Sequence, residues 1–240
     1  GTDYVYHSMI RDAEMAKHGI QLIAANPPGF AGLSVPKGFD FTIKSYASLV
    51  EKLATQEKID ILVGHSYMAT VLTEVARRGQ FQGKLVLISP SLEPDDEPIS
   101  TKMLDLVTRD PVMKDIVWLG MYAHLEEAFE DFFLENDTQH LNHAAAEARK
   151  TTISSAQAML LHYFNYLRNE DHHFLKSLSQ SPAEIHYVHD GKDVVQHKSE
   201  NKNALLATGK VILHSLPNAS HMVMIDEARA MNLLLKEMSR

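Results

Sequence analysis

The chain has 240 residues, of which 45% are hydrophobic and 22% charged, values that are ordinary for a globular protein with a sizeable core. It carries 31 acidic against 23 basic residues, a net charge of −8, which argues against nucleic acid or an anionic membrane as a partner. The lack of cysteine excludes disulfides, thiolate metal sites and a cysteine nucleophile. No apolar run approaches the roughly 20 residues that span a bilayer, and the sequence shows no signal peptide. The compartment is left open, with the cytoplasm favoured.

Five short apolar runs, each bounded by Gly, Pro, Asn or Asp, predict buried strands of a parallel sheet. In chain order they are Ile20–Ala25, Ile59–Val63, Lys84–Ser89, Glu184–His189 and Lys210–Leu216. Amphipathic stretches with helical spacing lie between them, and such alternation is typical of an α/β layered fold. The predicted helices are Tyr4–His18 (ending at Gly19), Thr42–Gln56, Tyr67–Arg78 and Asp226–Met238.

One region breaks this alternation. From about Ser91 to Pro182 the sequence has no convincing strand, only helical patterns rich in Met, Leu, Phe and Ala. We therefore expect residues 1–92 and 183–240 to form one α/β core, and residues 93–182 to form a helical cap inserted between two of its strands. The predicted cap helices start near Ser100, Val112, Thr138 and His172.

Ser66 lies at a very short turn between a predicted strand and a predicted helix, in the run Gly64-His65-Ser66-Tyr67-Met68. A serine at such a turn has its hydroxyl exposed at the end of the sheet, in a strained backbone. The helix that begins at Tyr67 directs its free N–H groups toward the same place, so the Tyr67 amide would stabilise an oxyanion there. Taken alone, the pattern fits a simple helix cap equally well, and His65 is interpreted as a packing residue.

Two later loops strengthen a catalytic interpretation. Asp193 and His221 follow consecutive predicted strands, and loops after parallel strands gather at one edge of a sheet, where ligands bind. A serine becomes a good nucleophile when an imidazole accepts its proton and a carboxylate orients that imidazole. The sequence therefore predicts a triad of Ser66, Asp193 and His221. Alternative positions for the acid are Asp190, Asp95 and Asp96.

With these motifs in place, the chain resembles the α/β-hydrolases over nearly its whole length. The matching segments are Gly-His-Ser-Tyr-Met, Gly-Lys-Asp-Val-Val and Asn-Ala-Ser-His-Met-Val, and residues 26–34 resemble the family's Pro-Gly-x-Gly-x-Ser turn with one residue added. The resemblance implies a mostly parallel sheet flanked by helices, a helical cap, Ser66 as nucleophile, Asp193 as acid and His221 as base. It implies no cofactor.

The chain also departs from the family pattern. Met68 and Ser220 stand where glycine is usual, so the neighbours of Met68 must be small or displaced. Family members have three strands before the first helix, and the third normally lies between the strands predicted at Ile20 and Ile59. We therefore expect N-terminal strands that are missing from this sequence or supplied by another chain. Thr2, next to Gly1 of the family's His-Gly motif, is the second candidate oxyanion donor.

These observations predict a serine hydrolase that cleaves a small or medium carboxylic ester through an acyl-enzyme. Peptidase, thioesterase, lactonase and carbon–carbon bond hydrolase activities would use the same triad, and a non-catalytic ligand-binding protein is the alternative from another class. We expect a small-molecule substrate and no nucleic-acid partner, and a homo-oligomer stays open. The 14 histidines include three pairs, most of whose members we interpret as surface or capping residues and not as metal ligands: His140 and His143, His172 and His173, His186 and His189.

Overall fold

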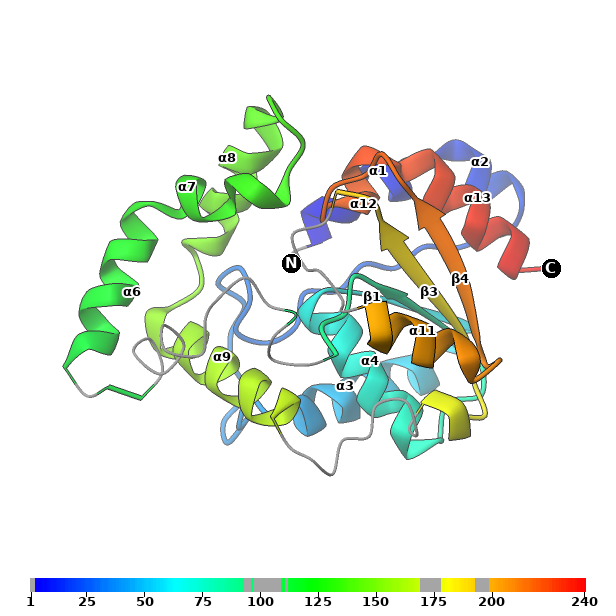
Figure 1. Cartoon of the computed structure of the whole chain (residues 1–240), viewed down its shortest axis with the longest axis horizontal. Helices are drawn as coiled ribbons and strands as arrows, with labels where there is room; N and C mark the ends of the chain where they lie inside the picture. Colours follow the sequence, from blue (N-terminus) through cyan, green and yellow to red (C-terminus); the bar gives the residue numbers. More distant parts are fainter. Residues whose placement is uncertain (1–2, 93–95, 97–108, 111, 169–177, 193–198) are drawn as a thin grey trace.

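Four parallel strands carry the fold. The computed structural model describes residues 3–92, 96, 109–110, 112–168, 178–192 and 199–240. The strands are β1 (Ile61–His65), β2 (Lys84–Ile88), β3 (Glu184–Asp190) and β4 (Val211–Leu216), and they lie side by side in that order (Figure 1). All three pairs are parallel, with Ile61 opposite Lys84 and Lys84 opposite Glu184. The carboxyl ends of all four strands therefore meet at one edge of the sheet.

Helices cover both faces of the sheet (Figure 1). Successive strand residues point to opposite faces, so Leu85 and Leu87 join one core while Val86 and Ile88 join another. The first core packs against α3 (Ile43–Glu57), α4 (Tyr67–Arg78), α9 (Ile153–Leu167) and α11 (Ser199–Ala207). The second packs against η1 (Asp3–Tyr6), α1 (His7–Ile10), α2 (Ala13–Lys17), α12 (Val223–Asp226) and α13 (Ala228–Met238). Burial on both faces explains why the strand sequences are almost continuously apolar.

The strand predicted at Ile20–Ala25 is wrong, because its backbone is irregular and forms no ladder in the part of the chain that the structure describes. Its side chains nevertheless alternate in exposure: Leu22 packs against the second core, whereas Ile23 is 48% exposed. The apolar pattern of residues 20–25 reflects this alternation and so resembles that of a strand. A strand also needs a hydrogen-bonded neighbour, which this segment lacks among the described residues. The expected N-terminal strands stay a prediction.

The first predicted helix is interrupted. Asp12 lies between α1 and α2, and its carboxylate accepts a hydrogen bond from the Glu14 amide at 2.9 Å. An aspartate in this position begins a new helix rather than continuing the old one. The predicted C-terminal helix agrees with α13 to within two residues, and the short helix α12 precedes it. The Asn232 side chain of α13 donates to the carbonyl of Met9, which joins the C-terminal helix to α1.

Several helices lie between β2 and β3 along the chain: α6 (Met113–Ala123), α7 (Leu125–Phe129), η3 (Glu130–Phe132), α8 (Thr138–Ala148) and α9. Figure 1 shows α6, α7 and α8 extending to one side of the sheet. The predicted starts near Val112 and Thr138 agree with α6 and α8, whereas those near Ser100 and His172 lie outside the described residues. The prediction missed the start of α9, where the Thr152 hydroxyl caps the helix by accepting from the Ser155 amide. Among the described residues, no helix combines the length and apolar character needed to cross a membrane.

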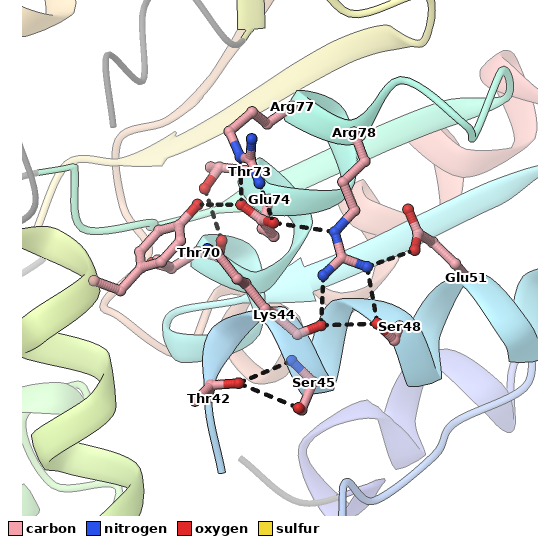
Figure 2. Close-up of polar contacts among 11 residues, drawn as sticks. Thr42, Lys44, Ser45, Ser48, Glu51, Thr70, Thr73, Glu74, Arg77 and Arg78 are labelled. Carbon is pink, nitrogen blue, oxygen red and sulfur yellow. Dashed lines mark hydrogen bonds and ion pairs between the residues drawn. The ribbon is translucent and has the colours of Figure 1, made fainter. Parts of the chain in front are cut away.

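A buried ionic network fixes α4, the helix that follows Ser66. The Glu74 side chain is fully buried, and its carboxylate accepts hydrogen bonds from Arg77 and Arg78 of the same helix (Figure 2). Arg78 continues the network to Glu51 of α3 at 2.8 Å, and Tyr166 of α9 donates to Glu74 at 3.2 Å. The network therefore joins α4 to α3 on one side and to α9 on the other.

Candidate active site

Ser66 lies in a strained backbone between β1 and α4. Its dihedral angles are φ 52° and ψ −120°, a region that residues with a Cβ atom rarely adopt. The turn is so tight that a Cβ atom on Gly64 would lie 2.6 Å from the Met68 carbonyl oxygen, which explains why glycine is needed there. The Ser66 amide donates to the Ile88 carbonyl at 2.9 Å and so extends the pairing of β1 with β2 up to the turn.

The side chains that follow Ser66 pack against the first core. Helix α4 and strand β1 approach each other most closely at Gly64. The Met68 side chain is partly buried and packs against the first core. Tyr67 makes ring contacts with Tyr46 at 5.7 Å and with Tyr163 of α9 at 5.1 Å. Because Tyr67 is the first residue of α4, its amide has no carbonyl partner within the helix. This amide is therefore a hydrogen-bond donor beside the serine.

The loop that carries His221 is held by a serine and an aspartate. The Ser220 amide and hydroxyl both donate to the Asp226 carboxylate at 2.7 Å, and the Met222 amide donates to the Ser220 hydroxyl at 3.2 Å. Ser220 is 2% exposed, so these bonds are sheltered from water. The departure from glycine at this position thus adds a tether to the loop. The sequence analysis missed the role of Asp226, which is the last residue of α12 and follows Ser220 by six positions.

His221 is brought to the nucleophile turn through His65. The His221 side chain is buried, and its backbone carbonyl accepts a hydrogen bond from Nε2 of His65 at 2.8 Å. The two imidazole rings lie 4.6 Å apart, and the ring of Phe132 in η3 lies 4.9 Å from that of His221. Because His65 directly precedes Ser66, the structure brings the serine and histidine loops together. His65 packs as expected, but it also makes a bond that the sequence did not indicate.

The loop that leads to Asp193 begins beside the loop that carries His221. The amide of Gly191 donates to the Leu216 carbonyl at 3.2 Å, and that of Lys192 donates to the Ala219 carbonyl at 3.1 Å. A Cβ atom on Gly191 would lie 2.3 Å from the Pro217 carbonyl oxygen, so these loops approach as closely as glycine allows. The next residue, Asp193, lies outside the described residues, as does Thr2.

The alternative acids occupy different places. Asp190 is the last residue of β3, and Asp95 lies outside the described part of the chain. Asp96 is 3% exposed and accepts a hydrogen bond from the Leu92 amide at 2.9 Å. Asp193 stays the predicted acid, and the segment that leads to it, Gly191 and Lys192, bonds to the residues that lead to His221.

The paired histidines mostly have local partners. His140 bonds to the Asp137 carboxylate through Nδ1 at 2.7 Å, and His143 stacks on Tyr4 with ring centroids 3.6 Å apart. His186 contacts Glu184 at 2.6 Å. His172 and His173 lie outside the described residues. Within the described ranges, no group of three or more His, Cys, Asp or Glu side chains is arranged to hold a metal ion.

Comparison with known proteins decides the family. The sequence profile described as the alpha/beta hydrolase family matches residues 2–232. The chain belongs to this family. No curated protein matches the chain in sequence.

Solved structures of α/β-hydrolases share the fold. Bromoperoxidase from Bacillus anthracis has a TM-score of 0.78 at 14% identity, over 99% of this chain and 87% of that one. An esterase from Exiguobacterium antarcticum has a TM-score of 0.77 at 15% identity, over 100% and 88%. The enol-lactonase from Burkholderia xenovorans LB400 has a TM-score of 0.68 at 14% identity, over 99% and 86%. The predicted α/β-hydrolase fold and the prediction of a hydrolase enzyme are thereby confirmed.

Proposed function

We propose that the chain is a serine hydrolase that cleaves a small or medium carboxylic ester through an acyl-enzyme on Ser66. One observation supports this proposal above the others. His65, the residue before the strained Ser66, donates a hydrogen bond to the backbone carbonyl of His221, so the serine turn and the loop that carries His221 lie together. A serine in this backbone has its hydroxyl at the end of the sheet, where a neighbouring imidazole can accept its proton.

The proposed reaction proceeds in two steps. Ser66 Oγ attacks the ester carbonyl while His221 takes the hydroxyl proton, and His221 then protonates the leaving alcohol. Asp193 orients the imidazole and stabilises its charged form, and the amides of Tyr67 and Thr2 donate to the oxyanion. A water molecule then attacks the acyl-enzyme, with His221 again accepting and returning a proton, which releases the carboxylic acid and restores Ser66.

The helices between β2 and β3 support a small, neutral substrate. We propose that α6, α7, η3, α8 and α9 belong to the cap of residues 93–182. Phe132 of η3 contacts the imidazole of His221, and Tyr163 of α9 contacts Tyr67. Aromatic side chains from this segment therefore lie beside both the serine turn and the histidine loop, and aromatic surroundings favour apolar acyl or aryl groups.

A fluorophosphonate reagent tests the mechanism. It should label the wild-type protein and the variant Ser239→Ala, which alters an exposed serine near the C-terminus, but not Ser66→Ala. Absence of labelling in a folded wild-type protein would refute the mechanism and favour the non-catalytic, ligand-binding alternative.

Chromogenic substrates test the bond type. A series of p-nitrophenyl esters of increasing acyl length should be hydrolysed faster than amino-acid arylamides. The opposite order would replace the ester assignment by a peptidase. Thioester, lactone and vinylogous diketone substrates, assayed at matched concentration, separate the remaining alternatives that share the triad.

A further inference from the structure

The bond between His65 and His221 joins two buried residues. His65 is 7% exposed and His221 is 3% exposed, and the donor and acceptor are 156 positions apart in the chain. The acceptor is a carbonyl oxygen, so Nε2 of His65 must carry a hydrogen atom. A buried bond of this kind is costly to lose, because the carbonyl would be left without that donor in a place that water reaches poorly.

The bond connects the histidine loop to a rigid part of the sheet. His65 is the last residue of β1, and the Ser66 amide beside it is bonded to the carbonyl of Ile88. The tether from Ser220 to Asp226 holds the same loop, but it leads to α12 and not to the serine turn. The His65 bond therefore relates the loop directly to the residue before the nucleophile.

We propose that His65 is a positioning residue that sets the distance and orientation of the His221 imidazole relative to Ser66. This role rests on the proposed function. The bond fixes the backbone of His221, and the ring contacts with His65 at 4.6 Å and with Phe132 at 4.9 Å restrict the imidazole itself. Proton transfer from a serine requires a well-aligned partner, and a displacement of about 1 Å reduces the rate on the order of 100-fold.

Substitutions at His65 separate the hydrogen bond from packing. His65→Gln keeps an N–H donor at nearly the same place, whereas His65→Phe and His65→Leu fill the space without a donor. We expect the two apolar variants to lose about 10- to 100-fold in kcat and in the rate of fluorophosphonate labelling, with KM changed less than about threefold. His65→Gln should retain the rate within about threefold. A residue that only packs would not be rescued selectively by glutamine.

The melting temperature of each His65 variant is measured as well, and rates are compared only at temperatures at which every variant is folded. His65→Leu guards against the case in which the larger phenylalanine prevents folding. Wild-type rates in the apolar variants would overturn the proposal. So would a His65→Gln variant that is as slow as they are.

Nuclear magnetic resonance gives a readout that does not need catalysis. In protein labelled with ¹³C-histidine, the ring signal of His221 is assigned by its loss in His221→Gln. This signal should broaden in His65→Phe, because the imidazole then samples several orientations, and should stay as sharp as in the wild type in His65→Gln. If the wild-type protein is not labelled at Ser66, the proposed function fails, and the spectra alone decide on the positioning of His221. An unchanged His221 signal in His65→Phe would then refute it.

Discussion

Replacing Glu74 by glutamine tests how strongly the buried network holds α4. In the folded protein the carboxylate accepts two bonds from Arg77 at 2.6 Å, one from Arg78 at 3.0 Å and one from Tyr166 at 3.2 Å. Glutamine has nearly the same shape, but it turns one acceptor into an NH2 group that faces arginine donors. The substitution therefore removes the charge and opposes donor to donor without creating a cavity.

The expected loss of stability follows from the burial of the two arginine partners of Glu74. Removing one member of a buried ion pair costs about 3–5 kcal/mol. Arg77 and Arg78 keep 39% and 20% of their side-chain surface exposed, and Arg78 keeps its bond to Glu51. Both cations can therefore be hydrated in part, which places the expected loss at the lower end, about 3 kcal/mol. For a chain of this length such a loss lowers the melting temperature by about 6–12 °C.

Denaturant unfolding and calorimetry of both proteins measure this difference. The matched control is Glu126→Gln, which breaks an exposed pair with Arg149 and should change stability little. Burial raises the pKa of Glu74, but the hydrogen bonds from Arg77 and Arg78 outweigh it and keep the pKa below its ordinary value. The contribution is thus present in full above the pKa of the unfolded chain and is lost as the pH falls through the folded pKa. A Glu74→Gln variant as stable as the wild type at pH 7 would refute the reasoning.

Three further predictions concern the site. Gly64→Ala should destabilise the fold by about 3 kcal/mol or more, because the alanine methyl group would lie 2.6 Å from the Met68 carbonyl oxygen. Soluble yield and the melting temperature measure this loss, and wild-type values would contradict it. Asp226→Asn should lower the free energy of unfolding by about 1–2 kcal/mol and slow ester hydrolysis, because it weakens both hydrogen bonds from Ser220. An unchanged denaturation midpoint and an unchanged hydrolysis rate would show that these bonds do not hold the His221 loop. Fluorophosphonate labelling at Ser66 should be strongly slowed in His221→Gln, which has no imidazole to accept the serine proton, and wild-type labelling of that variant would argue against a histidine base.

Much of the sheet could be predicted because buried parallel strands leave a strong trace in sequence. The run Lys84–Ser89 is apolar on both faces, and the observed strand β2 differs from it by one residue. Ile20–Ala25 shows the limit of this signal. Apolar residues of this segment pack against the second core. Whether a segment forms a strand depends also on a second segment that pairs with it, and the sequence of the first segment alone does not reveal that partner.

Helix ends were harder to predict than helices. An apolar stripe continues through Asp12, and only the competition of its carboxylate for the Glu14 amide interrupts the helix there. At the site, the turn at Ser66 could be predicted because the close approach of α4 to β1 requires glycine at position 64, next to the short strand–helix junction. The contact between His65 and His221 could not be predicted in the same way, because it depends on where two distant loops meet. Asp193 stays a prediction.

The dihedral angles of Ser66 imply that catalysis and folding make opposite demands on one position. Glycine adopts φ 52° without steric penalty, whereas a residue with a side chain there stores on the order of 1–3 kcal/mol of strain. Ser66→Gly should therefore melt at a higher temperature than Ser66→Ala. An engineering campaign that ranked variants by thermostability alone would select against the very hydroxyl on which turnover depends.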